Sequence, residues 1–245
     1  MMEELNRVVA YSLEFYFKKI ALLALFSIPF FAASLVPVLV PLPTYLAAGA
    51  LFARTGSLPD FSILDISIIV IAYLIAMFII ADTIVNINII VRSKRTLTET
   101  TQEMISAVPK HATRIFCVLT IVFILHLIAQ LLLHDIYGQT VIYPLFSFVL
   151  SYLLLFVPPA IVIDDSDVGT AIIRSGDLAL RKPLLCISWL AIGALTLVLS
   201  KISGDFLFSG VFSQYFALLV NSIVLLPFLI ILQTQMYMEK YPLAR

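Results

Sequence analysis

The segment LDISIIVIAYLIAMFIIADTIVNINIIV, residues 64–91, decides the fold class of this chain. Its only formally charged residues are Asp65, near one end, and Asp82, inside the run. A helix needs about 20 consecutive apolar residues to cross the hydrocarbon core of a bilayer. Because hydrocarbon offers no hydrogen-bond partner, the backbone amides of such a segment must bond to one another. Residues 64–91 are therefore predicted to form a transmembrane helix.

Five further apolar runs flank this segment along the chain. They are Ile20–Val40, Ile115–Leu133, Val141–Ile163, Pro183–Ser200 and Phe212–Met238. Of the 245 residues, 62% are hydrophobic and only 12% are charged, whereas about a quarter of the residues in a soluble domain are charged. So few charges cannot cover a water-facing surface. We predict a single all-α integral membrane domain, residues 1–245, with six transmembrane helices arranged as three hairpins.

The basic residues predict how these helices are oriented. If the N-terminus is cytoplasmic, all of the 15 lysines and arginines except Arg54 and Lys201 fall on the cytoplasmic side. Such an excess is the usual mark of cytoplasmic loops. Residues 1–19 begin with acidic side chains and lack the compact apolar core and cleavage site of a signal peptide. We therefore expect a multi-pass protein of the cell membrane, with both termini in the cytoplasm.

A threefold repeat is predicted from the segments on the basic side. Residues 4–19, 98–114 and 166–182 each mix polar and apolar side chains and end in one or more basic residues before an apolar run. Each can form an amphipathic helix that lies in the membrane interface. Lys19, Arg114 and Lys182 then mark equivalent points of three parallel repeats, residues 1–92, 96–163 and 164–240. The alternative is that any protein built of hairpins looks repetitive.

The third repeat carries a short motif. It consists of Ile163-Asp164-Asp165, then Ala171 with Arg174-Ser175, then Arg181-Lys182-Pro183. A second feature is the last apolar run, which contains Pro227 and is followed near the end of the chain by Gln235, Tyr237 and Lys240. This pattern resembles a group of six-helix prokaryotic membrane domains. The group includes the membrane domain of glycerophosphodiester phosphodiesterases and related uncharacterised families. The resemblance implies a fold and a topology, and it transfers no catalytic residue.

Asp82 and Asn86 are the first candidates for a functional site, because ionisable groups at membrane depth are rare. They lie one helical turn apart on one face. We expect them either to line a polar cavity that binds a cation or proton, or to make a structural hydrogen bond between helices.

His126 and Gln130 form a second polar pair with the same spacing, and Asn221 is a further candidate. A packed polar seam is the simpler interpretation of these residues. A zinc site needs three or four ligands, so we expect no metal and no cofactor.

Six basic residues beside the predicted interfacial helices are candidates for binding lipid headgroups. They are Lys18, Lys19, Arg114, Arg174, Arg181 and Lys182. A basic residue near an anionic surface contributes about 1 kcal/mol to membrane binding. The simpler interpretation is that these residues only set the topology.

Three functions remain open at this stage. The first is a non-enzymatic protein that binds or transports a small or amphipathic molecule. The second is a structural or regulatory module that interacts with lipids or a partner protein, and the third is an intramembrane enzyme that uses Asp82 and His126. We rank the enzyme last, because no phosphate loop, nucleophile elbow or metalloprotease motif is present. The net charge of zero argues against nucleic acid as a partner. Membrane lipids are the expected partners, and a homo-oligomer or a membrane partner stays open.

Overall fold

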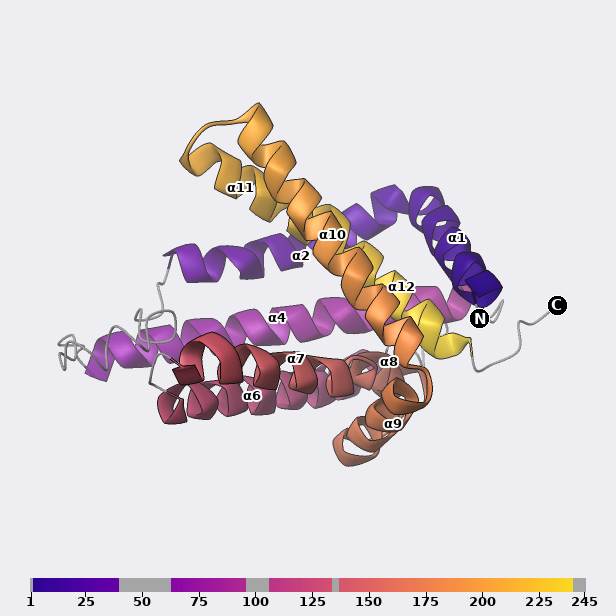
Figure 1. Cartoon of the computed structure of the whole chain (residues 1–245), viewed down its shortest axis with the longest axis horizontal. Coiled ribbons are helices and arrows are strands. Elements are labelled where there is room, and N and C mark those ends of the chain that lie inside the picture. The colour runs from indigo at the N-terminus through magenta and orange to yellow at the C-terminus, as the bar shows by residue number, and fades with distance from the viewer. Residues whose placement is uncertain (1, 40–62, 96–105, 134–136, 240–245) are drawn as a thin grey trace.

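The computed structural model describes residues 2–39, 63–95, 106–133 and 137–239, and within these ranges it contains helices and no strand (Figure 1). The α-helices are α1 Met2–Lys18, α2 Ile20–Leu39, α4 Ile63–Arg95, α6 Val108–Leu132, α7 Tyr143–Leu154, α8 Val157–Ile163, α9 Val168–Arg181, α10 Pro183–Leu207, α11 Val211–Val220 and α12 Leu226–Met238. Two π-helical segments, η1 Gly138–Ile142 and η2 Asn221–Leu225, precede α7 and α12.

Five helical segments are long and apolar enough to cross a membrane. They are Ser67–Ser93, Val108–Gln130, Gly138–Ile163, Pro183–Leu207 and Phe212–Met238. A sixth is obtained if α1 and α2, which meet at an angle of 88°, count as one bent span. This is the architecture of a polytopic α-helical membrane protein, as the sequence predicts.

Helices α1 and α9, which are inclined to the long helices, lie at one end of the bundle (Figure 1). Figure 1 shows α1, α9 and the ends of the described chain near the same ends of α2, α4, α6 and α10. We call this the basic end, because it carries Lys18, Lys110, Arg114 and Arg174, and we call the other the opposite end. A single residue, Lys19 or Lys182, joins α1 to α2 and α9 to α10. The threefold repeat and the interfacial position of α1 and α9 remain predictions.

Two predicted boundaries differ from the structure. Helix α6 begins at Val108 with a proline in its first turn and continues without a break past Arg114. The segment 98–114 is thus not a separate helix from residue 108 onward, and its residues 98–105 lie outside the described ranges. Helix α10 continues to Leu207, through residues predicted as an outer loop. There Lys201 pairs with Asp205 one turn later, and Ser213 of α11 donates a hydrogen bond to Asp205.

Prolines explain the interruption of the fourth span between α7 and α8. Pro159 has no N–H group, so it cannot donate to the Leu155 carbonyl one turn earlier. The Gln233 side chain of α12 donates to that carbonyl instead. Within the same break, Ser175 of α9 donates to the Leu153 carbonyl at 2.7 Å and accepts from the Phe156 N–H at 2.9 Å. Side chains of two other helices therefore satisfy the broken backbone, as a membrane interior requires.

The other prolines have different consequences. Pro183 leaves the Ala179 carbonyl of α9 without its usual donor, and the Tyr152 hydroxyl donates to it at 2.8 Å. Pro227 is the second residue of α12, which follows the π-helical segment η2, so the sixth span is irregular beside this proline. Pro29 and Pro37 lie inside helix α2, which continues from Ile20 to Leu39.

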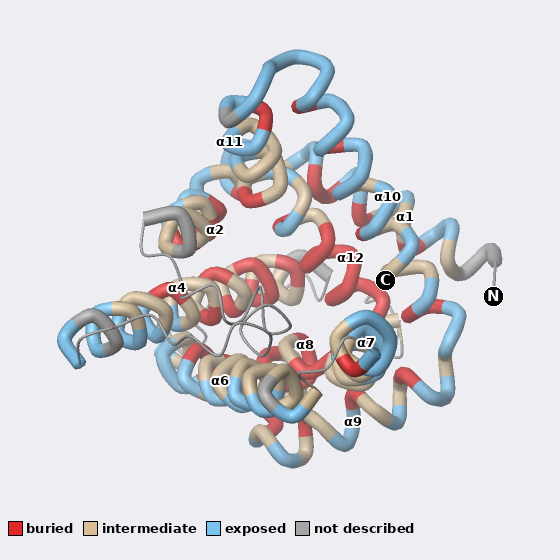
Figure 2. Tube along the Cα trace, turned by 60° about the vertical axis from the view of Figure 1, so that its left-hand side comes forward, coloured by how far each residue is buried: buried red, intermediate tan, exposed pale blue. Residues whose placement is uncertain are grey.

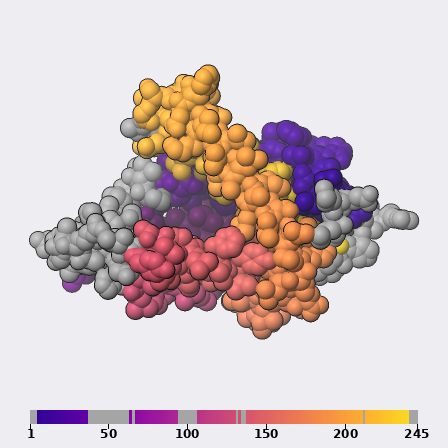
Figure 3. Space-filling model, in the orientation of Figure 1, coloured from indigo at the N-terminus to yellow at the C-terminus, as the bar shows by residue number. Residues whose placement is uncertain are grey.

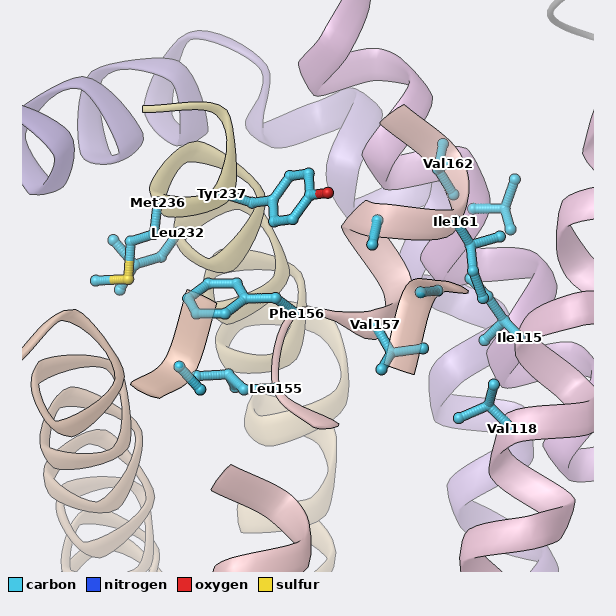
Figure 4. Close-up of a cluster of buried hydrophobic side chains, with 14 of the residues drawn as sticks. Ile115, Val118, Leu155, Phe156, Val157, Ile161, Val162, Leu232, Met236 and Tyr237 are labelled. Atoms are coloured by element: carbon cyan, nitrogen blue, oxygen red, sulfur yellow. The ribbon is translucent and has the colours of Figure 1, made fainter. Parts of the chain in front are cut away.

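The apolar core lies at the basic end. Figure 4 shows Phe156, Leu232, Met236 and Tyr237 gathered on one side of the break, and Val157, Ile161 and Ile115 on the other. In α12 every residue from Leu229 to Met238 is buried. Figure 2 shows α12 mostly in the colour of buried residues, whereas helix α7, in the other half of the bundle, contains no buried residue. The helices are thus tightly packed at the basic end, whereas α7 is loosely packed in the other half of the bundle.

The loose packing leaves a hollow in the molecular surface. Figure 3 shows it between α10 and α11 on one side and α7 on the other, with atoms of α2 and α4 visible at its floor. Helix α7 packs against α6 and α9, and α10 packs against α9, α11 and α12. Helix α9 therefore contacts both helices that flank the hollow.

Candidate functional site

Asp82 and Asn86 hydrogen-bond with each other on α4. The Asn86 amide donates to the Asp82 carboxylate at 3.0 Å, and both residues are half-buried. Within the described ranges, no side chain of another helix hydrogen-bonds with Asp82. The bond between helices comes instead from Asn88, whose side-chain oxygen accepts from Thr234 of α12 at 2.8 Å. Sequence analysis did not predict Asn88 as a contact residue.

His126 and Gln130 lie near the opposite end of α6. The His126 Nδ1 atom is 3.3 Å from the Tyr143 hydroxyl, and the imidazole ring lies against Phe146. The Gln139 amide of η1 donates to the Gln130 backbone carbonyl at 3.0 Å. These contacts join α6 to the start of the fourth span, which is the role of a packed polar seam.

The structure does not bring Asp82 and His126 together. The rings of Phe78 on α4 and Phe116 on α6 are in contact, with centroids 5.8 Å apart, and the two helices run in opposite directions. Asp82 lies one turn from this contact toward the basic end, and His126 lies almost three turns from it toward the opposite end. At 1.5 Å per residue the two are separated by about 21 Å along the bundle. The arrangement offers no shared position to a substrate.

Asn221 is the first residue of η2 and lies apart from both pairs. Segment η2 packs against α2, where Ser222 donates to Ser34 at 3.0 Å. The five candidate residues therefore occupy separate places in the bundle. They do not form one polar chamber.

The densest group of polar contacts is found at the turn between α8 and α9, residues 164–167, which we call the acidic turn. The Asp164 side chain is only 6% exposed and accepts from Arg174 at 2.8 Å and from the Tyr237 hydroxyl at 2.6 Å. Arg174 also donates to the Ser166 hydroxyl at 2.8 Å. The acidic turn is thereby attached to both α9 and α12.

Asp165 connects the acidic turn to α6. Its carboxylate accepts from Lys110 at 2.9 Å and from Arg114 at 2.7 Å, and Arg114 also donates to the Asp165 and Ser166 carbonyls. The hydrogen bond from Lys110, followed by that from Arg114 and the charges of both, lowers the pKa of Asp165 below its ordinary value. The carboxylate is therefore ionised at neutral pH.

Asp167 caps helix α9. Its carboxylate accepts from the Thr170 N–H at 3.3 Å, which satisfies one of the free amides at a helix start. The hydrogen bonds from Thr170 lower the pKa of Asp167. On the other side of the turn, Arg92 of α4 donates to the Val162 carbonyl at the end of α8, at 3.2 Å.

The six candidates for headgroup binding fall into three groups. Arg114 and Arg174 are bonded to the acidic turn. Lys18 and Arg181 pair with acidic residues one turn earlier on their own helices, Glu14 and Asp177. Lys19 and Lys182 occupy the two single-residue joints of α1 with α2 and of α9 with α10.

No protein-family model, curated protein or solved structure matches this chain. The class of polytopic α-helical membrane proteins therefore rests on the length and composition of the helices themselves. The resemblance to six-helix prokaryotic membrane domains stays a hypothesis. The residues that suggested it, Asp164, Asp165, Arg174 and Ser175, are those that build the acidic turn and the broken span.

Proposed function

We propose that this chain is a non-enzymatic membrane protein that binds an amphipathic, lipid-like molecule in the hollow between α7 and α10–α11. The carrying observation is the hollow itself (Figure 3), together with the absence of any buried residue on α7. Helices that are not packed against each other within the hydrocarbon leave a space between them, and an apolar molecule must fill this space. An acyl chain is the apolar molecule that a membrane supplies.

The helices that flank the hollow leave apolar side chains exposed, which favours an apolar ligand. Helix α7 exposes Leu145, Phe148 and Val149, and α10 exposes Leu195 and Val198. The polar candidates Asp82, His126 and Asn221 lie at separate places and supply no common site for an ion. The packed core at the basic end, around Phe156 and Tyr237, lies across the path from the hollow to that end. This supports binding over transport from one side to the other.

A tryptophan scan along α7 tests the proposal. Native mass spectrometry of the full chain in a non-ionic detergent, with added dioleoyl phosphatidylcholine, measures bound lipid in Leu145→Trp, Phe148→Trp and Val149→Trp. Overfilling a packed site typically costs about 1–3 kcal/mol, so we expect at least one of these variants to lose about tenfold in affinity. Ile124→Trp is the control, because Ile124 is similarly exposed but lies on a different helix, α6. Unchanged binding in all three α7 variants would refute the proposal.

A structural or regulatory module is the second candidate. It is supported by the exposed apolar side chains of the two short helices at the basic end, Leu13 and Phe17 on α1 and Ile173 and Leu180 on α9. Both helices also carry exposed basic residues, a combination typical of helices that lie on a membrane surface. If the parent protein binds no dioleoyl phosphatidylcholine but anionic lipid raises its Tm, this second function is favoured.

A further inference from the structure

Three side chains in the first turns of α6, at the basic end, face the Asp165 side chain of the acidic turn. They are Lys110, His111 and Arg114. Lys110 and Arg114 share this single carboxylate. Two full positive charges are thus met by one negative charge at this point.

His111 is a polar group whose environment the fold does not explain. Its side chain is 7% exposed, and its Nδ1 atom has no hydrogen-bond partner among the described residues. That atom lies 3.8 Å from the nearest carboxylate oxygen of Asp165, which is too far for a hydrogen bond. Buried polar atoms are normally satisfied. The fold therefore leaves this imidazole nitrogen without a hydrogen-bond partner among the described residues.

Arg114 also has hydrogen-bond donors that no described residue uses. All of its hydrogen bonds within the described part of the chain come from Nη1. Its Nη2 and Nε atoms donate to no described residue. A guanidinium group is suited to bind two oxygens of a phosphate at once.

The Asp165 carboxylate is replaceable. Its side chain is 57% exposed, and exposed ion pairs contribute little to stability. Its backbone has a φ of 48°, the only positive value of a non-glycine residue in the described ranges. This conformation is unfavourable for a residue with a Cβ atom, although aspartate tolerates it better than most. Nothing in these contacts requires the carboxylate to stay where it is.

We propose that Lys110, His111 and Arg114 form a phosphate-binding cradle, which the Asp165 carboxylate occupies as a competing internal anion. A phosphate group carries more charge than a carboxylate and offers more acceptor oxygens, so it can use Nδ1 of His111 and the spare donors of Arg114. Helix α6 has 25 residues and is about 37 Å long, which exceeds the hydrocarbon thickness of about 30 Å. Its first turns therefore lie at the level of lipid headgroups. The proposal goes beyond the binding of a lipid-like molecule in the hollow, and it does not depend on it.

The test measures binding of phosphate probes to the full chain in non-ionic detergent by native mass spectrometry and by the shift in Tm. The probes are dioleoyl phosphatidic acid, dioleoylglycerol, which lacks the phosphate, and inorganic phosphate. We expect Asp165→Asn to tighten phosphatidic acid binding about tenfold, because the competing charge is removed. Arg114→Gln is expected to weaken it about tenfold or more. Arg181→Gln is the control, because Arg181 is exposed at the same end and pairs only within its own helix.

The outcomes separate the cradle from a diffuse positive surface. The proposal would be overturned if Arg181→Gln and Arg114→Gln weakened phosphatidic acid binding equally. It would also be overturned if a folded Asp165→Asn protein bound phosphatidic acid no more tightly than the parent, or if the parent bound dioleoylglycerol as tightly as phosphatidic acid. If Arg114→Gln does not fold, Lys110→Gln replaces it, because Lys110 is exposed and makes a single ion pair. A gain in Asp165→Asn for both phosphatidic acid and inorganic phosphate supports a cradle for free phosphate. A gain for phosphatidic acid alone supports a cradle for headgroups. Neither result depends on the tryptophan scan of α7, which probes the other end of the bundle.

Discussion

The two halves of the bundle differ in how their helices are held together. At the basic end, α8 and α12 are almost entirely buried, and the side chains of Ser175, Gln233 and Thr234 connect different helices. At the opposite end, α7 is unburied, and hydrogen bonds such as those of Ser213 with Asp205 and of Gln139 with Gln130 join segments that follow one another along the chain. Lipid is as apolar as leucine, so apolar composition alone does not hold helices together in a membrane. Close packing and hydrogen bonds between segments distant in the chain make the difference.

The largest expected effect contrasts two phenylalanines of the fourth span. Phe156 is 0% exposed, whereas Phe148 is 53% exposed. Phe156→Ala leaves a cavity in the core and is expected to lower the free energy of unfolding by about 3 kcal/mol. Phe148→Ala should change it by less than about 0.5 kcal/mol. Thermal or denaturant unfolding in detergent, followed by circular dichroism, measures both, and equal losses would contradict the difference between the two halves.

The next effect concerns the buried carboxylate of the acidic turn. Arg174→Met removes the guanidinium group that donates to the Asp164 carboxylate at 2.8 Å. Because Arg174 is itself half-exposed, we expect a loss of about 2 kcal/mol, below the range for fully buried pairs. Arg181→Met on the same helix is the matched control, since its side chain is 75% exposed. A similar loss of unfolding free energy in both variants would mean that stability depends on the total charge of α9 and not on the ion pair with Asp164.

A smaller effect is expected for the side chain that satisfies the broken span. Gln233→Leu keeps the approximate volume but leaves the Leu155 carbonyl without a donor beside Pro159. An unsatisfied buried carbonyl costs about 1–2 kcal/mol. Thr196→Val, on α10, is the comparison, because its hydroxyl group bonds to a carbonyl that already belongs to a regular helix. The expectation fails if the two substitutions have the same effect on the unfolding transition.

The smallest effect is a dependence of stability on pH through Asp165. Its pKa is lowered in the folded protein, so its contribution to stability is present above its unfolded pKa, about 3.9. That contribution is lost as the pH falls through the lower, folded pKa. The difference in Tm between the parent and Asp165→Asn should thus be constant near neutral pH and disappear in acid. A difference that persists unchanged at pH 2 would show that the side chain acts through something other than its charge.

Part of the candidate site follows from the sequence and part does not. The positions of Pro159 and Pro183 identify two carbonyls, those of Leu155 and Ala179, that lack a donor within their own helix. The donors, Gln233 and Tyr152, lie far along the chain or on another helix, and no local pattern identifies them. Asp82 illustrates the opposite case, because its rarity at membrane depth suggested a site whereas its only described hydrogen bond is to Asn86 on the same helix.

The sequence by itself determined that this chain forms long apolar helices, because hydrocarbon excludes unbonded backbone and a fixed thickness sets the length of each run. It also fixed which backbone carbonyls lose their helical donor, because a proline residue has no N–H group wherever the chain folds. Only the tertiary structure decided how the helices cross, where the core closes around Phe156 and Tyr237, and where the hollow opens. It also brought Lys110, His111 and Arg114 against Asp165. These features depend on contacts between distant segments, and the apolar pattern of a membrane helix is nearly the same on every face.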